Sequence, residues 1–138
     1  MRGIMAKAPT FNNENDVKKR VNKLLNDRDW FWWSVPMNGF GKTGIADKAA
    51  IRDGVFVAIE CKFGSNKPTP LQKAYLQSVT SHGGLAFVVN EKNIDRLEEW
   101  LDAFDRAKTA IGNKDKVADE DGARMLDCIQ ALTEMMVA

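Results

Sequence analysis

The chain has 138 residues and a formal net charge of +1 at pH 7; 44% of its residues are hydrophobic and 28% are charged. This length and composition predict one globular domain with a single core. No apolar run approaches the ~20 residues of a transmembrane helix, and the first residues lack the apolar segment of a signal peptide. We therefore expect a cytoplasmic protein without a membrane partner.

The small net charge conceals an uneven distribution. Residues 1–90 contain 13 Lys or Arg and 7 Asp or Glu, a net +6, whereas residues 91–138 contain 7 and 12, a net −5. A polyanion such as DNA would be attracted to the first part and repelled by the second. On charge alone, an unevenly charged solvated surface is the simpler interpretation.

A helix is the first predicted element, after a flexible start over residues 1–10. Asn12 or Asn13 can cap its N-terminus. The apolar residues that follow recur at helical spacing and predict one buried stripe: Val17, Val21, Leu24 and Leu25.

Four consecutive aromatic residues, Trp-Phe-Trp-Trp over 30–33, begin a strand-like run that Pro36 ends. Such side chains can stack on nucleobases, but we favour a core strand that is covered on both faces. The glycine-rich loop over 38–44 follows it.

This loop contains Gly41-Lys42-Thr43, which matches the end of a phosphate-binding P-loop pattern. The full pattern needs a glycine where Pro36 stands, and a long helix after the loop. We therefore expect no nucleotide cofactor. Lys42 is instead expected to contact backbone phosphates of DNA.

Asp53-Gly54 is a strong signal for a two-residue hairpin turn, so the segment before it should pair with the apolar strand that follows. Side chains alternate between faces along a strand, which puts Glu60 and Lys62 side by side on one face. Both faces are apolar up to Glu60, so we expect a central strand that is covered on both sides.

Pairing across this hairpin brings Asp47 near Glu60. Two neighbouring carboxylates repel each other unless a cation lies between them, and oxygen-only ligands suit a hard ion such as Mg²⁺ or Mn²⁺. The sequence therefore predicts a divalent-metal site that can cleave a phosphodiester.

Thr69 and Pro70 are a good cap and a good first residue for the next helix. A short apolar strand over 85–89 follows, so strand, helix and strand predict a right-handed parallel crossover. His82 is expected to be a surface or capping residue. The expected buried stripe of this helix is Leu71, Tyr75 and Val79.

The C-terminal part predicts two more helices. Asn93 can cap the first of them. Residues 112–122 form an acidic linker to the second, over 123–138, which is expected to serve packing or dimerisation. The two cysteines, Cys61 and Cys128, lack metal-ligand spacing and are expected to be reduced and partly buried. One side of the first helix carries Ile94, Leu97, Leu101, Phe104, Lys108 and Ile111, and the apolar face of the last helix comprises Met125, Leu126, Ile129, Leu132 and Met136.

The ordered residues around the hairpin resemble the PD-(D/E)XK nuclease superfamily. The order is G-I-A-D over 44–47, a hairpin, and I-E-C-K over 59–62. The continuation, P-T-P-L-Q over 68–72, then a helix and G-G-L-A-F-V-V over 83–89, is similar to the VRR-NUC branch. The E-x-K pattern alone is weak, so the ordered set carries the resemblance. One departure is Ala46, where this branch often has proline.

This resemblance implies an α/β fold with a restriction-endonuclease-like core, a mixed central sheet flanked by helices, and extra C-terminal helices here. It implies an Mg²⁺- or Mn²⁺-dependent endodeoxyribonuclease in which Asp47, Glu60 and the backbone carbonyl of Cys61 hold the metal. Lys62 would orient the attacking water or stabilise negative charge, and Gln72 would bind a water or Lys62. Glu14 would orient an outer water, although an acidic residue is also favoured at any helix N-terminus.

The nuclease core would cover residues 1–111. Its stand-alone relatives resemble structure-specific endonucleases of phage-like settings, so we expect branched DNA such as four-way junctions, a homodimer that cuts two strands, and the host cytoplasm for a phage-encoded protein. The alternatives are a nicking or general DNase, a restriction-like nuclease, and a non-catalytic DNA-binding module. The lysines expected to bind DNA are Lys18, Lys19, Lys23, Lys42, Lys48, Lys67 and Lys73.

Overall fold

A computed structural model describes residues 9–35 and 46–137 of the chain. The elements, in chain order, are α1 (Glu14–Asp27), β1 (Phe31–Ser34), β2 (Lys48–Arg52), β3 (Val55–Cys61), α2 (Pro70–Ser81), β4 (Leu85–Val89), α3 (Ile94–Gly112) and α4 (Asp119–Val137). Lys42 and the rest of the glycine-rich loop lie outside the described residues.

The four strands form one mixed sheet in the order β1-β2-β3-β4. β1, β2 and β3 pair antiparallel, and β4 pairs parallel to β3 after the α2 crossover. The predicted hairpin at Asp53-Gly54, the parallel crossover and the α/β fold with additional C-terminal helices are confirmed. In the described part of the chain, no helix has the length and apolar character needed to span a membrane.

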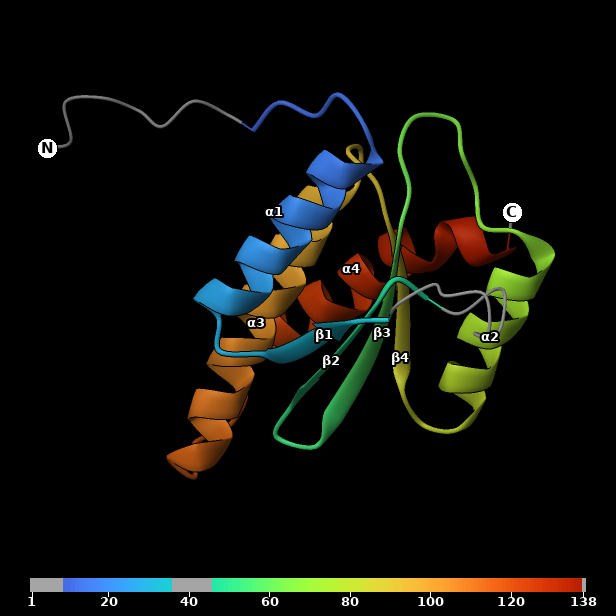
Figure 1. The fold of residues 1–138 in the computed structure, drawn as a ribbon. Coiled ribbons are helices and arrows are strands. Elements are labelled where there is room, and N and C mark those ends of the chain that lie inside the picture. The colour runs from blue at the N-terminus through green and yellow to red at the C-terminus, as the bar shows by residue number, and fades with distance from the viewer. Residues whose placement is uncertain (1–8, 36–45, 138) are drawn as a thin grey trace, which may run out of the picture.

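Strand β3 lies at the centre of the fold and is covered on both faces, as predicted (Figure 1). Val57, Ile59 and Cys61 point toward the core formed with α1 and α3. Ala58 points to the opposite face, where it packs with Leu76 of α2. Helix α4 contacts both clusters, because its first half packs with the α1 and α3 side and its last turns pack with the α2 side.

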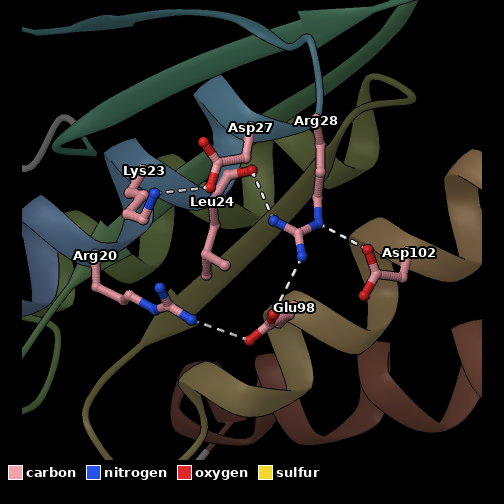
Figure 2. Close-up of polar contacts among 7 residues, drawn as sticks. All are labelled: Arg20, Lys23, Leu24, Asp27, Arg28, Glu98 and Asp102. Atoms are coloured by element: carbon pink, nitrogen blue, oxygen red, sulfur yellow. Dashed lines mark hydrogen bonds and ion pairs between the residues drawn. The ribbon is translucent and has the colours of Figure 1, made fainter. Parts of the chain in front are cut away.

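Helix α1 starts where the side chain of Asn13 accepts a hydrogen bond from the backbone N–H of Asp16 at 2.9 Å. Its predicted apolar stripe is buried. Its far end is held to α3 by Arg28, which donates to Asp102 at 2.8 Å and to Glu98 at 3.1 Å, while Arg20 reaches the same glutamate (Figure 2). Because Arg28 is largely buried, these charge-assisted bonds fix α1 against the core.

The prediction that the aromatic run is core on both faces is wrong for β1. Phe31 is 70% exposed and Trp33 is 40% exposed, whereas Trp30, just before the strand, is buried. β1 is an edge strand, and Leu76 of α2, the helix on the face of these two residues, packs against β3 and β4. Within β1, Trp32 is the one side chain that is partly buried, and it packs against the core on the α1 and α3 side.

Several details of the helices differ from prediction. In α2 the buried residue is Leu76, and Leu71 in the first turn is exposed. The side chain of Asn93 does not cap α3 but accepts from the N–H of Asn90 and donates to the carbonyl of Val88, which fixes the turn after β4.

Helix α4 begins at Asp119, inside the predicted linker, because its acidic first turn favours a helix N-terminus. Leu126 and Ile111, both expected on apolar faces, are exposed. Leu132 and Met136 are buried as predicted, and Cys128 joins them on the buried side of α4 at helical spacing. Both cysteines are buried and free, as expected.

Candidate active site

The carboxyl end of β3 and the N-terminal ends of α1 and α2 lie at the same end of the sheet (Figure 1). The register pairs Lys48 with Ile59, so the preceding residue, Asp47, lies opposite Glu60. This is the proximity that the hairpin predicted. The site is therefore assembled from four elements that are separated in the sequence.

Asp47 is held by both of its carboxylate oxygens. Oδ2 accepts a hydrogen bond from the backbone N–H of Cys61 at 2.8 Å. Oδ1 lies 3.6 Å from the ammonium of Lys18 on α1. The first contact connects the residue before β2 to the end of β3, so the carboxylate is aimed at the strand end by the sheet itself.

Glu60 is the most deeply buried charged residue of this group, at 1% exposure. Its Oε2 accepts from the side-chain amide of Gln72 at 3.0 Å and lies 3.4 Å from Nζ of Lys62. Its Oε1 is buried and has no hydrogen-bond partner in the described part of the chain. Burial first, and then the charge of Asp47, raise the pKa of Glu60 to about 7, against the opposing effect of Lys62.

Gln72 has two structural tasks. Its Oε1 accepts from the N–H of Thr69 at 2.9 Å while Thr69 Oγ1 accepts from the N–H of Gln72 at 3.2 Å, which forms a capping box. Its amide nitrogen is then directed at Glu60. The sequence predicted a water or Lys62 as its partner; the structure gives Glu60 instead.

Glu14 contacts Lys18 rather than the site carboxylates. Its Oε2 lies 3.2 Å from Nζ of Lys18, which bridges it to Asp47. Burial disfavours the charged lysine, but the carboxylates of Asp47 and Glu14 outweigh it, so the pKa of Lys18 is raised. Lys18 was expected to bind DNA, and its pairing with Glu14 was not predicted. The four-residue spacing between the two residues on one helix is the sequence signal for this pair.

The burial of Lys48 contradicts its predicted role in DNA binding. The residue is only 4% exposed. Its ammonium donates to Ser34 Oγ at 3.2 Å and lies 5.0 Å from the centroid of the Trp32 ring. Burial lowers its pKa. Since Lys48 points to the face of the sheet that α1 covers, a phosphate cannot reach it without disrupting the packing.

The other lysines that were expected to bind DNA have different environments. Lys19 and Lys67 are exposed, and Lys73 is half-buried. Lys23 is also exposed, and it pairs with Asp27 on the same helix at 3.1 Å (Figure 2). The structure thus leaves Lys19, Lys23 and Lys67 as lysines at the surface.

The residues near Glu60 offer few protein ligands to a metal ion, which would leave coordination positions for water or phosphate. Within residues 9–35 and 46–137, no three His, Cys, Asp or Glu side chains are grouped as metal ligands. The site offers two carboxylates, with the Cys61 carbonyl as the predicted third ligand. Mg²⁺ is commonly bound by one or two carboxylates and keeps several waters or phosphate oxygens. The unpartnered Oε1 of Glu60 fits such an ion.

A surface cavity of about 510 Å³ lies elsewhere, at the far end of α2 and beside the hairpin tip. Its lining includes Phe56, Tyr75 and His82 but no carboxylate. A hard ion such as Mg²⁺ is usually bound through carboxylates, so the carboxylate pair marks the better candidate site despite the size of this cavity.

No protein-family model matches the chain, and no curated protein matches it. The function is therefore inferred from the residues of the site and from the ordered motifs that contain them.

Proposed function

We propose that the protein is a divalent-metal-dependent endonuclease that hydrolyses phosphodiester bonds in DNA. The observation that carries the proposal is Glu60, a deeply buried carboxylate with one unpartnered oxygen beside Asp47. Lys62 and Gln72 both approach Oε2, so Oε1 is the oxygen without a partner in the described part of the chain. A buried polar atom without a partner is costly, and a bound cation would offset that cost. The resemblance to the PD-(D/E)XK superfamily supports the same assignment.

Asp47, Glu60 and the backbone carbonyl of Cys61 would hold Mg²⁺ or Mn²⁺. When bound, such an ion lowers the pKa of a coordinated water and stabilises charge on the phosphate. Lys62, half-buried and 3.4 Å from Glu60, would orient the attacking water or stabilise the developing negative charge. Gln72 would keep Glu60 in the orientation that hydrolysis requires.

The proposed substrate class is branched DNA, in particular four-way junctions. The resemblance to stand-alone members of the VRR-NUC branch supports this choice. The excess positive charge of residues 1–90 supports a polyanionic substrate. Exposed lysines such as Lys19 and Lys67 would contact its phosphates and position it without reading sequence.

A cleavage panel tests the proposal. Junction, flap, duplex and single-stranded DNA would be incubated with the protein and Mg²⁺ or Mn²⁺, and we expect cleavage of the junction that EDTA abolishes. Glu60→Gln and Asp47→Asn should lose this activity. Asp53→Asn, an equivalent change at the exposed hairpin tip, should keep it.

Full activity in both site variants would contradict the assignment of Asp47 and Glu60. Equal cleavage of all DNA forms would favour a general DNase. Binding to DNA without cleavage under any metal condition would favour a non-catalytic DNA-binding module.

A further inference from the structure

Two lysines, Lys18 and Lys62, accompany the two site carboxylates. Lys62 lies 3.4 Å from Glu60 and Lys18 lies 3.6 Å from Asp47. Each carboxylate therefore already has a cationic neighbour from the protein. These two lysines differ in how firmly their surroundings hold them.

Lys62 is confined, since its side chain is 13% exposed and belongs to the residue that directly follows β3. Lys18 is 33% exposed and projects from the surface of α1. It also has a second anionic partner, because Glu14 lies one helical turn away at 3.2 Å. Lys18 can thus leave Asp47 and remain paired with Glu14, whereas Lys62 forms its ion pair with Glu60.

Lys18 faces Asp47 Oδ1, whereas Oδ2 already accepts a hydrogen bond from the N–H of Cys61, so Oδ1 is the carboxylate oxygen with more capacity for a metal ion. A divalent cation coordinated by Oδ1 would repel an ammonium at this distance. Lys18 and the ion therefore compete for the same oxygen.

We propose that Lys18 is a built-in competitor of the metal ion, which holds Asp47 while the ion is absent and retreats to Glu14 when the ion binds. This inference rests on the proposed function, since it assumes that Asp47 is a metal ligand. It gives Glu14 an indirect role as the alternative partner of Lys18, in place of a direct contact with the site water.

Calorimetric titration of the full-length protein with Mn²⁺ alone, without DNA, measures this competition. Removing the competitor in Lys18→Met should tighten Mn²⁺ binding about three- to fivefold, the upper range for a partly exposed ion pair. Lys19→Met removes the same charge from the neighbouring exposed position and should change the Kd by less than about twofold. Circular dichroism would verify that both variants fold.

The Glu14→Gln change provides a second, independent test. It should weaken Mn²⁺ binding in the presence of Lys18, because the lysine loses its alternative partner, and have little effect in the Lys18→Met background. This non-additivity is the signature of coupled residues. Equal weakening in both backgrounds would assign Glu14 a direct role and overturn the proposal.

The sign of the Lys18 effect also separates two roles. Weaker Mn²⁺ binding by Lys18→Met would mean that Lys18 positions Asp47 for the ion. Equal Kd values for the Lys18 and Lys19 variants would mean that Lys18 neither competes with the ion nor positions Asp47. Both results overturn the proposal while leaving the metal site intact. No binding of Mn²⁺ to the wild-type protein at millimolar concentration would overturn the metal site, and this inference with it.

Discussion

Glu60 brings an ionisable group into the most buried position of the site. Its pKa of about 7 in the folded protein lies above the ordinary value of 4.5. Below pH 4.5 the group is protonated in the folded and the unfolded chain alike, and its full contribution to stability is present. As the pH rises toward 7, the unfolded chain releases this proton more readily, so stability is lost through that range.

We therefore expect the metal-free protein to lose stability between about pH 4.5 and 7 relative to Glu60→Gln, which cannot ionise. Urea denaturation in EDTA at several pH values measures the difference. Identical pH profiles for the two proteins would show that Glu60 ionises as easily in the folded state as in the unfolded state.

Lys62 is expected to act on the rate rather than on substrate binding. Lys62→Ala removes one positive charge among many but takes away the group that the proposed mechanism puts beside the reacting phosphate. The cleavage rate should fall about 10²-fold or more, with DNA affinity almost unchanged. Single-turnover kinetics and DNA titration measure the two quantities, and Lys67→Ala in the exposed loop is the matched control. A similar loss in both variants would indicate a general electrostatic effect.

At the scale of elements, the start of α2 contains a capping box that stabilises the helix and also contacts the candidate site. Thr69 and Gln72 share the capping box, but only Gln72 also contacts Glu60. Thr69→Ala should therefore cost about 1 kcal/mol of stability and leave turnover within a few fold of wild type. Gln72→Ala should impair turnover as well, because Glu60 loses its donor.

Urea denaturation and single-turnover cleavage of both variants separate these effects. Loss of turnover in proportion to the loss of stability in both variants would assign Gln72 a purely structural role. Wild-type behaviour of Gln72→Ala would weaken the resemblance to the VRR-NUC branch.

The elements themselves were largely predictable, because their signals are local. Asp53-Gly54 specified the hairpin, Thr69-Pro70 the start of α2, and strand alternation the two faces of β3. The pairing of Asp47 with the end of β3 followed from these. The sequence could not show which strand is an edge, so the exposure of Phe31 and Trp33 was missed.

Local sequence patterns also could not predict the burial of side chains that are covered by residues distant in the sequence. Lys48 is covered because α1 and β1 meet over it, and its partner Trp32 lies on a different strand. The contact between Lys18 and Asp47 likewise joins α1 to the residue before β2, across 29 positions of the chain. Such contacts follow from the tertiary packing of elements and not from the residues on either side.

For the molecule as a whole, we expect a homodimer, because a four-way junction must be cut on two strands and a twofold pair of sites achieves this. The apolar face of α4 packs within its own chain, so it is not the expected contact surface. Phe31 and Trp33 on edge strand β1 are exposed, with ring centroids 5.6 Å apart. Among the described residues β1 pairs with β2 alone, and an edge strand with exposed aromatic side chains is suited to association.

Light scattering at micromolar concentration should give twice the chain mass of 15.4 kDa. Joint replacement of Phe31 and Trp33 by serine should yield a monomer, whereas Leu126→Ser, at an exposed position on α4, should not. A wild-type monomer that still cuts both strands of a junction would contradict the dimer.

The two buried thiols lie in parts of the fold that open by different routes. Cys61 is on the central strand between two packed faces, and Cys128 is on α4 against α3 and the carboxylate of Glu99. Burial raises the pKa of each thiol, which makes both poorly reactive while folded. Alkylation of Cys128 is expected to need only the detachment of α4, whereas alkylation of Cys61 is expected to need α1 and α3 to move off the sheet face that they cover. The alkylation rate of Cys128 would therefore report the detachment of α4, and that of Cys61 would report a larger opening of the core.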